Sequence, residues 1–177
     1  NFFEFYCDRK KRHNLIHLLK SGVIIDTKVL VMYLVGFYDT INNTDYLNRF
    51  SISRDEYKTL IKFKEEMEIE NFIVTPYILT EVYNEIQNKT NKDFIKKIIK
   101  IMRLLIKEYP EKYYEKNLIM ERNKFGDFDF SDIANFLATE EELHLLTKDR
   151  PVCGICKPNN AFAIHMEDLM GVQSGIR

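Results

Sequence analysis

The sequence predicts an α/β fold in which helices cover both faces of a mainly parallel sheet. Short apolar runs alternate with longer helical patterns along the chain, and only a few residues join each run to the next helix. Such short joints favour right-handed crossover connections between parallel strands. The chain has 177 residues, which suits one domain better than two, so we expect a single domain over residues 1–177.

The composition excludes several classes of protein. Hydrophobic residues make up 45% of the chain and charged residues 30%, which is typical of a soluble globular domain. The 26 basic and 27 acidic residues nearly cancel, so any attraction to nucleic acid has to be local. Three cysteines are too few for a secreted disulfide framework, and charged residues interrupt the apolar stretches. We therefore expect a cytoplasmic protein with no membrane partner, whose residues 1–20 form a helical extension.

The first third of the chain predicts a strand followed by two helices. Residues 23–25, Val-Ile-Ile, are β-branched throughout and indicate a buried strand. A helix should follow this strand as far as a polar loop over residues 39–48. Ser53 then opens the next helix, because Ser53 and Glu56 have the spacing of a capping box.

The middle of the chain predicts a second strand and two helices. Phe-Ile-Val at residues 72–74 is the strand, and Thr75-Pro76 is a typical helix opening. A long amphipathic helix is predicted over residues 89–107, with apolar residues on one side and basic residues on the other. The basic side includes Lys92, Lys96, Lys100 and Arg103.

The last third predicts one helix and two more strands. Asp129 or Ser131 is placed to cap a helix that carries apolar residues at helical spacing. The leucine-rich residues 143–146 predict a third strand, and residues 161–164 predict a short last one. These elements complete the alternation of strands and helices on which the fold class rests.

Acidic residues recur where the predicted strands end. Asp26 directly follows the first strand, Asp149 follows the third across two residues, and Glu81 lies early in the helix after the second. Asp132 lies in the first turn of the helix near the third strand. Because ligands of parallel sheets bind outside the carboxyl ends of the strands, we expect these four acids at one rim.

Carboxylates held together raise one another's pKa unless a cation offsets their charge, so a divalent metal is expected with them. Mg²⁺ and Mn²⁺ prefer oxygen ligands and promote hydrolysis of phosphodiesters. Two alternatives remain open from the residues alone. An Asp in a first helical turn, such as Asp132, is more often a capping residue than a ligand. Glu85 is a rival to Glu81 on the same side of its helix.

Four strings of residues, in the same order, resemble the motifs of the PIN (PilT N-terminus) domain family. They are VIIDT at residues 23–27, TPYILTEV at 75–82, FDFSD at 128–132 and LLTKDR at 145–150. Each string is a weak signal by itself, but four in register are more specific. The resemblance spans residues 22–164 and leaves residues 1–20 uncovered.

This resemblance implies a three-layer α/β/α sandwich and the activity of a Mg²⁺- or Mn²⁺-dependent endoribonuclease. The implied site consists of metal ligands at Asp26, Glu81, Asp132, Asp149 and Asp129, supported by Thr27 and Thr147. Many bacterial relatives are toxins of toxin–antitoxin pairs. The implied partners are therefore an RNA substrate, an antitoxin protein and a second copy of the chain in a homodimer.

One residue departs from the family pattern. The family usually has Asn after the Asp-Thr pair, whereas this chain has Lys28. The Lys28 ammonium is placed either to contact the scissile phosphate or to weaken metal binding through like-charge repulsion. The second outcome defines an alternative function, a catalytically weakened PIN-like module that binds RNA or a protein.

Three other features have weaker functional readings. Lys92, Lys96, Lys100 and Arg103 could follow an RNA backbone, with Tyr113 and Tyr114 stacking on bases, although a solvated helix face is the commoner outcome. Cys153 and Cys156 have redox-type C-x-x-C spacing, but too little chain follows them for a thioredoxin fold. A zinc site is not expected, because the cysteine pair lacks a second pair at suitable spacing.

Overall fold

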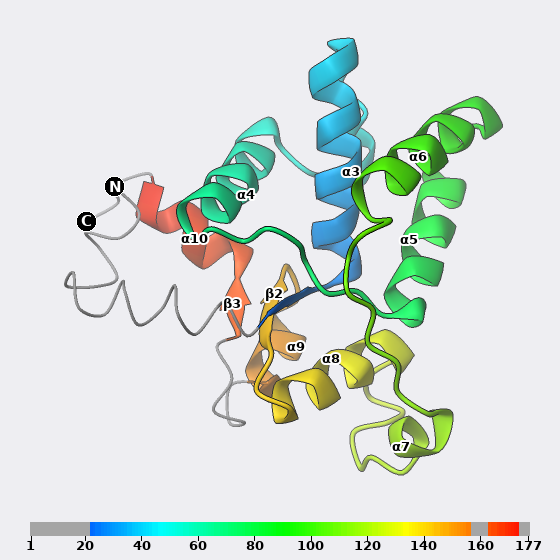
Figure 1. Ribbon diagram of the computed structural model, residues 1–177, viewed down its shortest axis with the longest axis vertical. Helices are drawn as coiled ribbons and strands as arrows, with labels where there is room; N and C mark the ends of the chain where they lie inside the picture. The colour runs from blue at the N-terminus through cyan, green and yellow to red at the C-terminus, as the bar shows by residue number, and fades with distance from the viewer. Residues whose placement is uncertain (1–21, 157–162, 174–177) are drawn as a thin grey trace.

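A small parallel sheet lies at the centre of the computed structural model, which describes residues 22–156 and 163–173 (Figure 1). Its strands are β1 (Val23–Ile25), β2 (His144–Thr147) and β3 (Ile164–His165), in the order β1-β2-β3. All pairings are parallel, with Ile24 opposite Leu145 and Leu146 opposite Ile164. The mixed α/β class predicted from the sequence is confirmed. The predicted extension over residues 1–20 lies outside the described residues.

Two parallel bridges extend the sheet beyond β1. Ile73 pairs with Ile24, and Val74 pairs with Glu111. The prediction of a full strand over residues 72–74 is therefore wrong in its extent, since Ile73 and Val74 form one bridge each, Phe72 forms none, and Thr75 already caps the next helix. From β1 the chain first adds pairings on one side and later adds β2 and β3 on the other. This reversal makes the boundary between β1 and β2 a topological switch point, where open α/β sheets bind their ligands.

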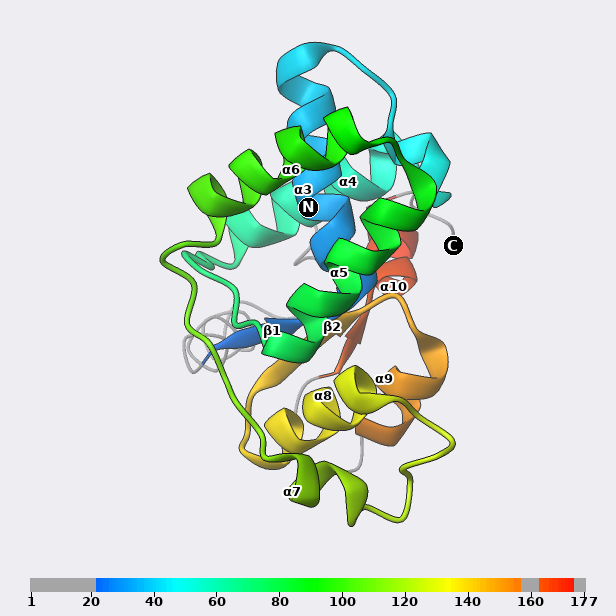
Figure 2. The same ribbon diagram turned by 90° about the vertical axis from the view of Figure 1, so that its right-hand side faces the viewer.

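Eight α-helices and one 3-10 helix surround the sheet in the described part of the chain. They are α3 (Thr27–Asn42), η1 (Leu47–Phe50), α4 (Arg54–Glu66), α5 (Pro76–Lys89), α6 (Lys92–Leu105), α7 (Lys116–Met120), α8 (Phe130–Glu140), α9 (Arg150–Cys156) and α10 (Met166–Gln173). Helices α8 and α9 lie on one side of the sheet, and α3, α4 and α6 lie on the other (Figure 2). The strands are buried along their whole length, as the apolar runs predicted.

Side-chain caps open the helices that the sequence predicted. Asp26 caps α3 and Thr75 caps α5, where Pro76 takes the first helical position. Ser53 and Glu56 form the predicted capping box at the start of α4. Asp129, rather than Ser131, caps α8. These caps set where each helix leaves the sheet, and so they set where its first side chains lie.

The amphipathic helix predicted over residues 89–107 is confirmed as α6, with shorter bounds, since α6 begins at Lys92 and ends at Leu105. Helix α5 ends at Lys89, and Asn91 caps α6 by accepting a hydrogen bond from the Phe94 amide at 2.9 Å. The buried side of α6 is formed by Phe94, Ile98 and Ile101. A capping Asn within an otherwise helical pattern ends one helix and begins the next, because its side chain replaces the missing backbone partner.

The ends of three other elements also differ from the prediction. Helix α3 continues to Asn42, because Asp39 is buried inside it and accepts hydrogen bonds from the amides of Tyr46 and Leu47. Strand β2 is shifted one residue toward the carboxyl end of the chain. Strand β3 begins at Ile164, and residues 161–162 of its predicted range lie outside the described residues. None of the described helices has the length and apolar character needed to cross a lipid bilayer.

Candidate acidic site

A cavity of about 390 Å³ opens at the carboxyl edge of the sheet, beside the switch point between β1 and β2. All five acidic residues predicted from the sequence line it, although they come from four different parts of the chain. The lining consists of Asp26, Thr27, Lys28, Glu81, Asn84, Glu85, Asn88, Lys89, Asp129, Ser131, Asp132 and Asp149. The structure therefore brings the predicted acids to one place, together with Thr27 and Lys28.

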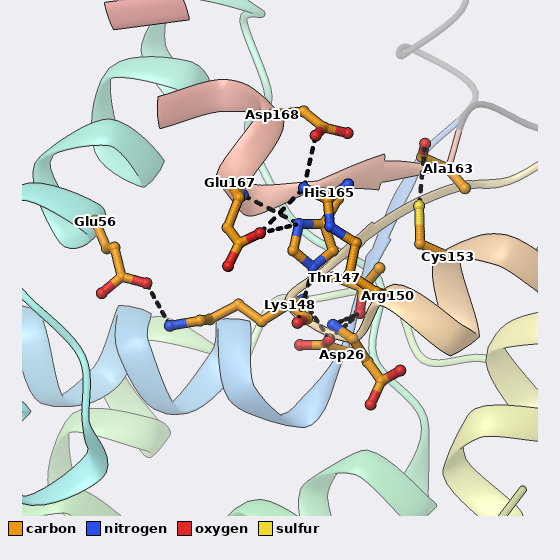
Figure 3. A network of polar contacts seen from close by, with 11 residues as sticks. Asp26, Glu56, Thr147, Lys148, Arg150, Cys153, Ala163, His165, Glu167 and Asp168 are labelled. Atoms are coloured by element: carbon orange, nitrogen blue, oxygen red, sulfur yellow. Dashed lines mark hydrogen bonds and ion pairs between the residues drawn. The ribbon is translucent and has the colours of Figure 1, made fainter. Parts of the chain in front are cut away.

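Asp26 is the most buried acid of the site, with 7% of its surface exposed. Its Oδ1 atom accepts a hydrogen bond from the Val29 amide at 2.8 Å. Its Oδ2 atom accepts one from the Lys148 amide at 2.8 Å and one from the Thr147 hydroxyl (Figure 3). Burial raises the pKa of Asp26 above its ordinary value, and Asp149 adds to this, although the three hydrogen bonds oppose it.

Thr147 connects the first and fourth acids. Its hydroxyl donates to Asp26 and accepts a hydrogen bond from the Asp149 amide at 2.8 Å. Asp149 then caps the start of α9, where its Oδ1 accepts from the Val152 amide at 3.0 Å. Thr147 itself is fully buried beneath the cavity, so it positions these acids rather than facing a ligand.

Glu81 is held between the starts of two other helices. Its Oε2 accepts a hydrogen bond from the Thr27 hydroxyl at 2.7 Å, and the Ser131 hydroxyl lies at the same distance from it. Burial raises the pKa of Glu81, and Asp129 and Asp26 act in the same direction. The rival Glu85 also lines the cavity, but it forms an ion pair with Lys89 at 2.9 Å. Glu81 is therefore the acid that contacts the other parts of the site.

Asp129 and Asp132 have different roles at the start of α8. Asp129 is the capping residue, and its Oδ1 accepts from the amides of Ser131 and Asp132 at 2.9 and 3.0 Å. Asp132 is not needed as the cap. Burial, and then the charges of Asp129 and Asp149, raise the pKa of Asp132 from 3.8 to about 7. The capping interpretation, which was open for Asp132, belongs to Asp129.

The loop after β2 is fixed on its far side by a second set of contacts (Figure 3). The Lys148 ammonium forms a half-buried ion pair with Glu56 of the α4 capping box. The Lys148 carbonyl lies 2.9 Å from Nε2 of buried His165. Because the Glu167 amide donates to Nδ1 of His165, the Nε2 atom carries the proton and donates to Lys148. The backbone that presents its amide to Asp26 is thus held by two neighbouring elements.

Sequence reasoning missed several lining residues. Ser131 stands inside the third motif, but its contact with Glu81 depends on how α5 and α8 are placed. Asn84 and Asn88 follow Glu81 by three and seven residues, so helical periodicity alone would place them on the same face of α5. Lys28 is exposed at the cavity, and no ion pair involves it among the residues that the structure describes.

The structure does not bring the predicted basic residues to the cavity. Lys92, Lys96, Lys100 and Arg103 are all exposed, on the side of α6 opposite its buried face, and none lines the acidic cavity. Tyr113 is 68% exposed, as base stacking would require. The same expectation for Tyr114 is wrong, because its ring is buried against the core.

The two cysteines of α9 do not form an accessible redox site. Cys153 and Cys156 are both buried thiols, and neither is in a disulfide. Burial raises the pKa of Cys156 to about 11, which opposes formation of the reactive thiolate. Their position within α9, whose first turn Asp149 caps, gives them a packing role next to the site.

Comparison with protein-family models, with curated proteins and with solved structures found no match. Within residues 22–156 and 163–173, no group of three or more His, Cys, Asp and Glu side chains is arranged as a ready-made metal site. The site is therefore defined by its own geometry, an acidic cavity with oxygen atoms spaced along its walls.

Proposed function

We propose that this protein is a divalent-metal-dependent endoribonuclease with a PIN-like, three-layer α/β/α fold. The observation that carries the proposal is the convergence of Asp26, Glu81, Asp132 and Asp149 on one cavity at the switch point of a parallel sheet. These four residues are separated by long stretches of sequence. A purely structural explanation leaves open why four acids meet where their charges repel.

The electrostatics of the cavity support a bound cation. The pKa values of Asp26, Glu81 and Asp132 are all raised, with burial as the largest cause in each case. A divalent cation would offset this cost by stabilising the ionised carboxylates. The donor set consists of oxygen atoms, which Mg²⁺ and Mn²⁺ prefer, and Mg²⁺ usually binds through one or two carboxylates while it keeps several waters. Spaced carboxylates in an open cavity fit that mode.

The residues of the cavity would have two roles, to bind the metal and to position the residues that bind it. Glu81, Asp132 and Asp149 would hold the metal directly or through water, and Asp26 would contribute the oxygen atoms that its three hydrogen bonds orient. Mg²⁺ or Mn²⁺, when bound, supplies activation of a water and stabilisation of the leaving oxygen. Thr27 and Ser131 keep Glu81 in place, and Asp129 holds the first turn of α8.

The preference for RNA, and the further role of a toxin that an antitoxin protein controls, rest on the resemblance of the four motifs. The chemistry of the cavity applies to phosphodiesters of either sugar. A homodimer is proposed on the same ground. Each of these points is testable separately from hydrolysis.

Cleavage of RNA and DNA oligonucleotides with Mg²⁺, with Mn²⁺ and with EDTA tests the proposal. Asp26→Asn, Asp132→Asn and Asp149→Asn should each abolish metal-dependent cleavage. Asp127→Asn is the matched control, because Asp127 is exposed, close in sequence and outside the cavity. Cleavage that persists in EDTA, or that survives Asp132→Asn and Asp149→Asn, would overturn the proposed mechanism.

A second candidate function follows from Lys28, whose ammonium is exposed at the same cavity. A cation there competes with a metal ion and favours a module that binds RNA or protein with little catalysis. Under this alternative, Lys28→Asn raises both Mg²⁺ affinity and cleavage rate. If Lys28 instead contacts the scissile phosphate, Lys28→Asn raises the KM for RNA, whereas Lys28→Arg preserves it.

A further inference from the structure

Aromatic rings from α5, from α8 and from the segment before α8 contact one another. Tyr77 and Phe130 stack with their ring centroids 5.8 Å apart and their planes 30° apart. Phe125 meets Phe130 edge to face, with centroids 5.1 Å apart. Phe130 is 37% exposed, although an apolar ring at the start of a helix could have turned toward the core. The cluster therefore presents aromatic surface to solvent.

The positions of these rings in the chain place them beside the acids. Tyr77 precedes Glu81 by four residues on α5, so the two side chains lie on one face, one helical turn apart. Phe130 stands between Asp129 and Ser131, which both line the cavity. The wall of the cavity continues along α5 in the other direction to Lys89. Along α5, Tyr77 therefore lies one turn before the first lining residue, and Lys89 is the last lining residue.

A contact within the chain holds the aromatic cluster in place. The Tyr77 hydroxyl donates to the Tyr114 carbonyl at 2.5 Å, which fixes the ring on α5 to the segment before α7. Tyr113, which is 68% exposed, directly precedes Tyr114, so this hydrogen bond also places its backbone close to the Tyr77 ring. A rigid, preformed aromatic surface loses little conformational entropy when a flat ligand stacks on it.

We propose that Tyr77 and Phe130, with Tyr113 at their margin, form a stacking platform for a nucleobase of a single-stranded nucleic acid. This rests on the proposed function, because the phosphodiester next to that base would lie in the acidic cavity. Aromatic side chains bind bases of any sequence through their faces, whereas the bases of a duplex are already stacked on one another. The platform would therefore select single strands and position the chain along α5.

The acidic cavity makes such a contribution necessary. Six carboxylates line it and repel a polyanion, and among the described residues only Lys28 and Lys89 line it as cations. Base stacking adds attraction that depends neither on the charge of the substrate nor on a bound metal ion. Single-stranded substrate should accordingly bind, more weakly, even when the metal has been removed.

The chain contains no tryptophan, so a Phe130→Trp variant carries a single tryptophan reporter on the platform. Its fluorescence should be quenched by an eight-nucleotide oligoadenylate RNA in EDTA, where cleavage cannot occur. An oligomer of the same length without bases, and a blunt RNA duplex, should quench it much less. Leu104→Trp is the matched control, because Leu104 is 71% exposed on α6 and should show no quenching that depends on bases.

Two substitutions of Tyr77 distinguish the contribution of its ring to binding from that of its hydroxyl. Tyr77→Leu should weaken oligoadenylate binding about tenfold, the scale expected for one stacked ring, while Tyr77→Phe keeps the affinity. Equal quenching by the base-free oligomer, or unchanged binding by Tyr77→Leu with the protein folded, would overturn the platform. Cleavage by a protein without base-dependent quenching refutes the platform alone. Base-dependent quenching by a protein that never cleaves refutes the nuclease alone.

Discussion

At the scale of single residues, the hydroxyl of Thr147 forms hydrogen bonds with two residues of the acidic site. It donates to Asp26 and accepts from the Asp149 amide, so one atom orients two of the four acids. A neutral side chain that cannot be ionised or displaced by a metal ion is suited to this position. The acids are thereby oriented before any ligand arrives.

Thr147→Val should destabilise the protein and disorder the site. Valine has the same shape but leaves the half-buried Asp149 amide without its partner, which costs about 1–3 kcal/mol of unfolding free energy. Urea unfolding followed by circular dichroism measures this. Thr147→Ser is the control, since it retains the hydroxyl and should keep both stability and cleavage. A Thr147→Val protein with full activity would show that the hydroxyl is dispensable.

The raised pKa of Asp132 predicts a particular dependence of stability on pH. Its carboxyl titrates at about 7 in the folded protein, against an ordinary value of 3.8. Between these values the folded protein holds a proton that the unfolded chain has lost. The contribution of Asp132 is therefore fully present below pH 3.8 and is lost as the pH rises toward about 7.

Melting temperatures in EDTA, measured across that pH range, test this prediction. As the pH rises, the melting temperature of Asp132→Asn should increase relative to that of the wild-type protein. Mg²⁺ at neutral pH should restore the wild-type protein, because a ligand that binds only the folded state stabilises it. Asp127→Asn removes the same charge outside the cavity, so a similar slope in that control would refute the assignment to Asp132.

Residues at strand ends were the most predictable part of the site. Asp26 and Asp149 follow apolar runs, and the pairing of β1 with β2 brings them to one edge. The contact of Ser131 with Glu81 was not predictable in the same way, because it depends on the relative placement of α5 and α8. Local sequence patterns indicate the helix or strand position of a residue, whereas tertiary packing determines which residues its side chain contacts.

At the scale of elements, the crossing of α3 and α4 depends on Gly36. A Cβ atom at this position would lie 2.2 Å from the Tyr57 ring, so the ring of Tyr57 on α4 packs directly on the backbone of α3. This contact fixes α4, and α4 in turn carries the Glu56 carboxylate that holds Lys148 behind the site. A helix that contributes no residue to the cavity thus supports it.

Gly36→Ala should cost about 1–3 kcal/mol of stability, because the methyl group overpacks a buried interface. Gly154→Ala is a matched control, since no atom lies within 4 Å of its added Cβ in α9. The control should be neutral or slightly stabilising, as alanine favours a helix over glycine. Thermal or urea unfolding distinguishes the two variants. Equal unfolding free energies for both variants would show that the packing of α3 on α4 accommodates the methyl group without loss of stability.

The helix openings were predicted better than the pairing of strands. Ser53 with Glu56 and Thr75 with Pro76 act through contacts within a few residues, which the sequence displays directly. The bridge between Val74 and Glu111 joins distant segments, and nothing local at Glu111 indicates it. The start of α6 was predicted three residues early, at residue 89, because the apolar spacing was read without the cap at Asn91.

At the scale of the whole molecule, charge is divided between two surfaces. The acidic cavity lies at the sheet edge, and the basic residues of α6 lie on an outer helix face. The predicted alternation of strands and helices was enough to place the acids, because it sets the carboxyl edge. It could not place the basic face relative to that edge, since the orientation of α6 follows from its packing on α3.

Replacement of both Lys96 and Lys100 by Gln tests whether the outer basic face contributes to RNA binding. Cleavage of a four-nucleotide RNA should be unchanged, because neither lysine lines the cavity. If long RNA extends over α6, its KM should rise, and the slope of log affinity against log salt should fall by about 1.4, or about 0.7 for each phosphate contact. If the salt dependence of long-RNA binding is unchanged in this variant, the basic face of α6 does not contact RNA.

The hydrogen bond between Asp26 and Thr147 closes a loop of 121 positions. Contacts between such distant residues form late in folding, since the entropy of closing a long loop is lost before the contact is gained. A growing chain on the ribosome has already made Asp26 and Glu81 long before β2 and Asp149 exist. Any activity of this cavity therefore begins only when synthesis has passed β2 and the chain has folded, and incomplete chains are inactive by construction.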